Sequence, residues 1–131
     1  MALLQISEPG KSTMPHEHRL AVGIDLGTTN SLIASVISGE VSILEQENKE
    51  SLLPSIVHYS SNNTIVGNEA KNLQIKDPKN TISSVKRLIG KNLSDIDTNL
   101  YSLNLKDDDG VIGILTDQGI KNPVEVSSDI L

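Results

Sequence analysis

The first third of the chain alternates short apolar runs with polar turns. Apolar side chains dominate residues 20–24 and 32–37, and apolar and polar residues partly alternate over 41–45. Polar segments at 25–31 and 38–40 separate the three runs. The pattern predicts a three-strand meander. Its first two strands are almost continuously apolar, which predicts burial on both faces, although this chain alone hardly supplies enough partner surface for that.

Two more strands are predicted after residue 50. The run 52–59 contains Pro54 near its start, which is typical of an edge strand. The polar residues 60–63 predict a hairpin turn into a strand at 64–67. His58 lies in the first of these strands and is interpreted as a structural residue.

From residue 68 onward, the spacing of the apolar residues changes to one that is typical of helices. Residues 68–75 predict a short helix that ends before Asp77-Pro78. Asn80 is a suitable N-cap for a second helix, which Gly90 would end. The predicted apolar face of that helix consists of Ile82, Val85, Leu88 and Ile89.

The last third of the chain predicts mainly strands. A polar connection at 94–99 leads to a hairpin with strands at 101–105 and 111–115 around residues 106–110, Lys-Asp-Asp-Asp-Gly. A turn at 116–119 precedes a short strand at 124–126. Residues 127–131 resemble a capped helix N-terminus, so we expect the sequence to be a piece of a longer protein.

The length, composition and charge of the chain narrow the classes of protein to which it could belong. The chain has 131 residues, which suffices for one small domain, and it has no cysteine, which excludes disulfides and thiolate metal sites. A net charge of −6 argues against a nucleic-acid surface. The sequence has no apolar run long enough to span a membrane, and its start lacks the features of a signal peptide, so a cytoplasmic protein is expected.

The polar turn between the first two predicted strands carries the candidate chemistry. Gly27 allows the backbone to approach an anion closely, and successive turn amides can form a concavity for phosphate oxygens. The hydroxyls of Thr28 and Thr29 add donors. Asp25, at the end of the first strand, could hold Mg²⁺ through water beside that phosphate. The alternative is an ordinary hairpin turn, because these residue types are common in turns.

Three other patterns are interpreted as structural or solvated. His16 and His18 have a spacing that could bind metal on a strand, but a polar tail is favoured. The segment 10–12 resembles the end of a Walker A motif and lacks its first glycine and preceding strand. The acidic residues within 106–110 lack the spacing of a calcium loop, so a solvated hairpin tip is expected.

Residues 23–31, Gly-Ile-Asp-Leu-Gly-Thr-Thr-Asn-Ser, resemble the first phosphate-binding loop of the DnaK-type heat-shock chaperones, whose fold is shared with actin and the sugar kinases. Residues 86–90, Lys-Arg-Leu-Ile-Gly, resemble a second string of that family at the matching distance. Lys86 on a solvated helix face is the alternative. The resemblance implies an α/β fold, the N-terminal part of an actin-like ATPase domain, with ATP or ADP and Mg²⁺ as cofactors.

The resemblance also implies roles. Lys86 would reach the γ-phosphate and the attacking water, and Asp25 would hold the hydrated Mg²⁺. The residues implied to hold phosphate are Gly27, Thr28, Thr29 and Asn30.

The finer resemblance is to the subfamily that serves iron–sulfur cluster assembly. It rests on residues 1–10, 53–59 and 81–86, and implies a J-domain co-chaperone and an iron–sulfur scaffold protein as partners. The expected organisation is an N-terminal extension at 1–18 and a truncated nucleotide-binding domain at 19–131, which we expect to lack ATPase activity on its own. The alternatives are a general DnaK-type chaperone, a sugar kinase and a non-enzymatic remnant.

Overall fold

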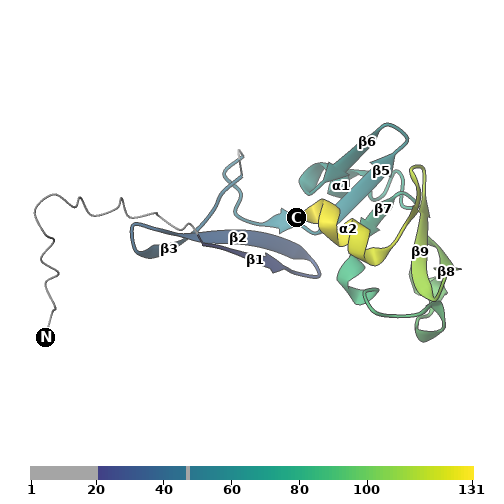
Figure 1. The fold of residues 1–131 in the computed structure, drawn as a ribbon. Coiled ribbons are helices and arrows are strands. Elements are labelled where there is room, and N and C mark those ends of the chain that lie inside the picture. The colour runs from purple at the N-terminus through teal and green to yellow at the C-terminus, as the bar shows by residue number, and fades with distance from the viewer. Residues whose placement is uncertain (1–20, 47) are drawn as a thin grey trace, which may run out of the picture.

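A computed structural model describes residues 21–46 and 48–131, which form three antiparallel sheets and two α-helices (Figure 1). Predictions that concern residues 1–18 lie outside the described residues: the N-terminal extension, the His16–His18 pair and the segment 10–12. No helix among the described residues is long and apolar enough to cross a membrane.

The first sheet is the predicted meander. Its strands are β1 (Val22–Leu26), β2 (Asn30–Ile37) and β3 (Glu40–Ile43), in that order, with the short β4 (Leu53–Pro54) paired to the start of β2. Asp25 lies opposite Leu32 and Ile24 opposite Ile33 in the register of β1 and β2. Figure 1 shows that this sheet extends away from the rest of the chain.

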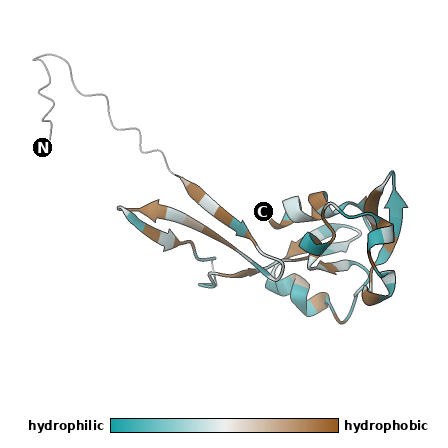
Figure 2. Cartoon of the chain, turned by 90° about the horizontal axis from the view of Figure 1, so that it is seen from below, coloured by the Kyte–Doolittle hydropathy of each residue, from teal (hydrophilic) through white to brown (hydrophobic). Residues whose placement is uncertain are grey.

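Both faces of the meander carry exposed apolar side chains. Ile24, on one face, is 54% exposed. Val41 and Ile43 are 78% and 52% exposed, and their register with β2 places them on the opposite face. Figure 2 shows the apolar positions as brown bands along these strands. The described residues thus leave both faces of the meander largely uncovered, which agrees with the predicted shortage of partner surface in this chain.

The hydrophobic core lies in the other part of the chain, between two small sheets and a helix. One sheet has the order β6-β5-β7 and the other the order β10-β9-β8. Val57, Ile82, Ile112 and Val126 are fully buried in one cluster at their junction. The elements involved are β5 (Ile56–Ser60), β6 (Asn63–Val66), α1 (Asn68–Leu73), β7 (Thr81–Ser83), β8 (Asn104–Asp108), β9 (Val111–Thr116), β10 (Gly119–Lys121) and α2 (Pro123–Ile130).

The helix predicted after Asn80 is wrong. This segment forms β7, in which Ile82 pairs with Val57 of β5, and then the 3₁₀ turn η1 (Val85–Arg87). Ser84 separates the two with a left-handed φ of 54°, which ends the strand and starts the turn. The segment forms a strand because it pairs with β5 at the edge of the sheet and buries Ile82 completely. These long-range contacts stabilise the strand more than the helical spacing of its apolar residues favours a helix.

The strand predicted at 124–126 is also wrong, because α2 already begins at Pro123. Asn122 caps this helix: its side-chain oxygen accepts hydrogen bonds from the amides of Val124 and Glu125 at 3.0 and 2.9 Å. The Glu125 carboxylate accepts from the Asn122 amide at 2.8 Å, which completes a capping box. The helix start predicted at residue 127 is thus several residues too late.

Most of the other predicted elements are found with shifted bounds. The hairpin of β8 and β9 turns at Asp109-Gly110, so it is tighter than predicted. The helix α1 ends at Leu73 rather than at 75. Two 3₁₀ turns, η2 (Leu93–Asp95) and η3 (Thr98–Leu100), interrupt the predicted polar connection.

Candidate functional site

The candidate phosphate loop is the tight turn between β1 and β2. A side chain at Gly27 would place its Cβ only 2.1 Å from the carbonyl oxygen of Asn30, so this turn requires glycine. Thr28 is half-buried, whereas Thr29 and Asn30 are exposed. The turn therefore places Thr28, Thr29 and Asn30 at an accessible position.

Ser55 holds this loop from the inner side, and the sequence analysis missed it. Its amide donates to the carbonyl oxygen of Thr29 at 2.8 Å, and its hydroxyl donates to the carbonyl oxygen of Gly27 at 2.8 Å. The Ser31 hydroxyl lies 2.9 Å from the same Ser55 oxygen. A polar residue directly after Pro54, inside a run predicted to be a strand, was the signal available in the sequence.

Lys86 meets the loop from a distant part of the chain. The 3₁₀ turn η1 carries it, and its ammonium nitrogen donates to the carbonyl oxygen of Leu26 at 2.8 Å. Leu26 is the last residue of β1, directly before Gly27. The two stretches singled out by resemblance are therefore adjacent in space, although η1 is not the predicted helix.

Asp25 is exposed on β1, one residue before the Leu26 carbonyl that Lys86 contacts. Strand alternation places its carboxylate on the face opposite Ile24. Within 21–46 and 48–131, no three His, Cys, Asp or Glu residues are grouped so that they could hold a metal ion. A lone carboxylate fits an ion that keeps most of its water, which is the way Mg²⁺ is usually held beside phosphates.

The donor set of the site fits a phosphate group. It combines turn amides, the hydroxyls of Thr28 and Thr29 and the ammonium of Lys86, all of which can donate to phosphate oxygens. Because residue 27 is a glycine, no Cβ covers the backbone of the turn where it approaches Asn30. These groups suit an anion and offer no apolar surface for a nucleotide base.

His58 has a structural environment, in agreement with its interpretation from the sequence. It is buried in β5, and its Nε2 lies 3.1 Å from a carboxylate oxygen of Asp77. Hydrogen bonds from Asn80, and then the contact with His58, hold the pKa of the Asp77 carboxyl below its usual value. These contacts, and the hydrogen bond from the Thr81 hydroxyl to the Asp77 carbonyl, hold the turn before β7.

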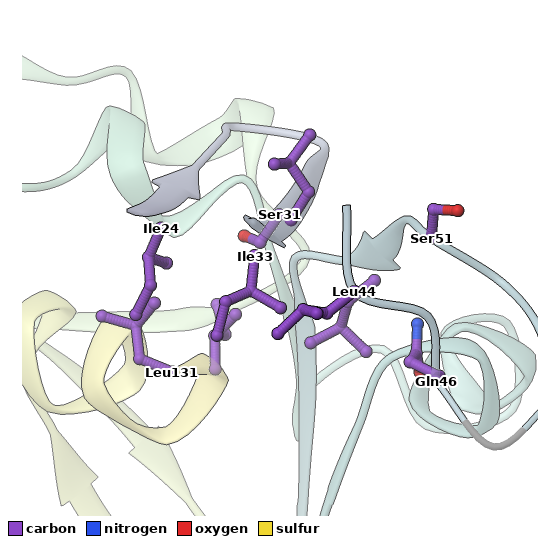
Figure 3. Close-up of a pocket in the computed structure, with 10 residues that line it drawn as sticks. Ile24, Ser31, Ile33, Leu44, Gln46, Ser51 and Leu131 are labelled. Atoms are coloured by element: carbon purple, nitrogen blue, oxygen red, sulfur yellow. The ribbon is translucent and has the colours of Figure 1, made fainter. Parts of the chain in front are cut away.

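An apolar hollow of 140 Å³ lies beside the loop, between β2 and the end of α2 (Figure 3). Ile24, Ile33, Leu44 and Leu131 point into it, and Ser31 marks its end nearest the loop. Thr28 and Thr29 do not line it. Its apolar walls make it unsuitable for phosphate, and it continues the exposed apolar face of the meander.

Comparison with known proteins adds a family and several relatives. A family model described as "Hsp70 protein" matches residues 21–131. Proteins described as "Chaperone protein HscA homolog" are 58% identical in Vibrio atlanticus, 57% in Haemophilus influenzae and 56% in Vibrio parahaemolyticus, each over the whole chain. The chain spans only 22% of the length of each of these relatives. The mixed α/β fold agrees with the predicted fold class.

Proposed function

Because the chain belongs to the Hsp70 family, we propose that it forms the first part of the nucleotide-binding domain of an ATP-dependent chaperone for iron–sulfur cluster assembly. The observation that carries the proposal is the hydrogen bond from Lys86 to the carbonyl of Leu26, which brings a cation to the phosphate loop. The HscA homologs named above support the choice of subfamily. Membership of the Hsp70 family removes the sugar-kinase alternative.

The proposal includes the organisation inferred from the sequence. Residues 19–131 belong to the nucleotide-binding domain, and residues 1–18 form an extension before it. A J-domain co-chaperone and an iron–sulfur scaffold protein are the proposed partners of the full-length protein, and the cytoplasm is the proposed location.

In this proposal the turn between β1 and β2 binds the phosphates of ATP. The amides of the turn donate to phosphate oxygens, and Gly27 allows the close approach. The hydroxyls of Thr28 and Thr29 and the side chain of Asn30 complete the contacts. Asp25 would hold a hydrated Mg²⁺, which would supply positive charge beside the phosphates.

Lys86 would act during hydrolysis. Its ammonium exchanges the Leu26 carbonyl for an oxygen of the γ-phosphate, where a full negative charge is the stronger partner. In that position it stabilises the charge of the transition state and orients the attacking water. Phosphoryl transfer depends mainly on such positioning and charge stabilisation, so no nucleophilic side chain is required.

The proposal can be tested on a chimera in which residues 1–131 replace the corresponding segment of the Vibrio atlanticus relative. Its ATP hydrolysis is measured alone, with an iron–sulfur scaffold and its J-protein together, and with an unfolded general client. The expected result is ATPase activity that rises most with the scaffold and J-protein.

Two results would contradict parts of the proposal. Equal or greater stimulation by the general client, without a response to the scaffold, would indicate a general DnaK-type chaperone. No ATP hydrolysis under any of the three conditions would overturn the proposed ATPase role.

A further inference from the structure

We propose that Ser55 is a positioning residue that sets the orientation of the phosphate loop for nucleotide binding. This inference rests on the proposed function, because it concerns the same loop. Ser55 lies in the segment between β4 and β5, far from the loop in sequence, and only 2% of its surface is exposed. It makes three polar contacts, and all of them are with the loop or with the first residues of β2.

The three contacts use the complete hydrogen-bonding capacity of the Ser55 amide and hydroxyl proton. The amide donates to the carbonyl of Thr29, and the hydroxyl donates to the carbonyl of Gly27, each at 2.8 Å. Since the single hydroxyl proton is directed to Gly27, the Ser31 hydroxyl is the donor in the 2.9 Å contact between the two serines. Ser55 thus binds both sides of the turn at once.

These contacts determine which way the peptide groups of the loop face. The described chain contains no cis peptide bond, so the C=O and N–H of each peptide group point in opposite directions. With the carbonyls of Gly27 and Thr29 directed toward Ser55, the amides of Thr28 and Asn30 are directed away from it. Ser55 therefore withdraws acceptor oxygens, which would repel phosphate, and leaves donors on the other side.

Loss of the Ser55 hydroxyl would release one of these constraints. The carbonyl of Gly27 would lose its partner, and its peptide group could rotate and present oxygen to the phosphate side. The hydrogen bond from the Ser55 amide to the Thr29 carbonyl would remain, and so would the pairing of β4 with β2. We therefore expect the defect to be confined to phosphate contacts, without a change in the recognition of the adenosine part.

The test compares Ser55→Ala with Ser127→Ala in the chimera described above. Ser127 is a matched control: it is 6% exposed, its hydroxyl donates to the Pro123 carbonyl at 2.7 Å, and it lies in α2. Both variants lose one buried hydroxyl. Affinities for ATP and for adenosine are measured by calorimetry.

Ser55→Ala is expected to weaken ATP binding by about tenfold, while adenosine binding changes less than about twofold. Ser127→Ala should leave both affinities within about twofold of the unmodified protein. Hydrogen exchange without nucleotide should change at the amide of Thr28, whose peptide group loses its constraint, in Ser55→Ala only, while the amide of Asn30 keeps its rate because the Thr29 carbonyl is still held.

Unchanged ATP affinity in Ser55→Ala, or an equal loss for ATP and adenosine, would overturn the inference while the proposed function stands. If the unmodified chimera does not bind ATP, the proposed function fails and the inference fails with it.

Discussion

Three residues from separate parts of the sequence meet at one turn. Gly27 permits the turn, Ser55 orients it, and Lys86 contacts the strand residue before it. Gly27 and Lys86 were predicted, because both lie in strings that resemble a known family. Ser55 was not, because its role depends on the pairing of β4 with the start of β2, which local sequence does not reveal.

At this scale the first prediction concerns Lys86→Ala in the chimera. The lysine is exposed and makes a single contact with a backbone carbonyl, so its loss should cost little stability. Its charge matters most in the transition state, so kcat should fall by about a hundredfold or more with a modest loss of ATP binding. Single-turnover hydrolysis and ATP titration measure the two effects separately.

Lys91→Ala is the control for this prediction, since Lys91 is an exposed lysine in the turn that follows η1. It should hydrolyse ATP at the unmodified rate. Normal turnover by Lys86→Ala would contradict the proposed role and would indicate that Lys86 is only a solvated surface residue.

At the scale of elements, alternation and turn residues predicted the meander and two further hairpins. The failures have identifiable causes. The segment of β7 has helical spacing, but it pairs with the edge of β5, a contact between residues far apart in sequence. The start of α2 was missed although Asn122, Pro123 and Glu125 form a recognisable N-terminal pattern, which the β-branched Val124 and Val126 obscured.

A hydrogen bond between elements gives the second prediction. Tyr59 of β5 is fully buried, and its hydroxyl donates to the Asp129 carboxylate of α2 at 2.6 Å. Burial, and then the hydrogen bond and charge of Asp129, raise the pKa of Tyr59 far above its usual value. The folded state therefore retains this proton to a higher pH than the unfolded state does.

The direction in which pH changes the free energy of unfolding follows from this difference in the pKa of Tyr59. The contribution of Tyr59 to stability is complete below pH ~10, where tyrosine is protonated in both states. Above pH ~10 the unfolded state loses the proton and the free energy of unfolding falls, by up to about 1.4 kcal/mol per pH unit from this residue. Urea unfolding of the 131-residue chain between pH 8 and 11, followed by circular dichroism, measures this slope.

Tyr59→Phe separates this residue from the lysines and Tyr101, which also titrate in this range. The variant should be less stable at pH 8 by about 1 kcal/mol, because it lacks the hydrogen bond to Asp129. Its stability should then fall less steeply above pH 10. Equal slopes for the two proteins would show that the Tyr59 hydroxyl is not responsible.

At the scale of the whole molecule, the core and the candidate site lie in different places. The buried cluster joins β5, β7, β9 and α2, whereas the phosphate loop belongs to the exposed meander. The sequence predicted that the meander would lack partner surface, and the exposed Ile24 and Val41 agree with that. The chain also spans only 22% of the length of its relatives.

The last prediction concerns ATP binding by the 131-residue chain itself. The described site offers donors for phosphate at the loop and at Lys86, whereas the neighbouring hollow is small and has mostly apolar walls, with Ser31, Gln46 and Ser51 as its polar lining residues. Exposed charge contacts of this kind are weak in water and are screened by salt. We therefore expect an affinity no tighter than roughly millimolar, about −4 kcal/mol.

Calorimetry at low and at physiological salt tests this expectation, with tripolyphosphate as the comparison ligand. Because the donors of the described site suit phosphate oxygens, we expect ATP and tripolyphosphate to bind equally weakly, and both to bind more weakly as salt is added. Micromolar ATP binding that tripolyphosphate does not match would mean that this part of the chain already contains a base-binding surface. In that case the phosphate loop would be only one part of a nucleotide site formed within the chain.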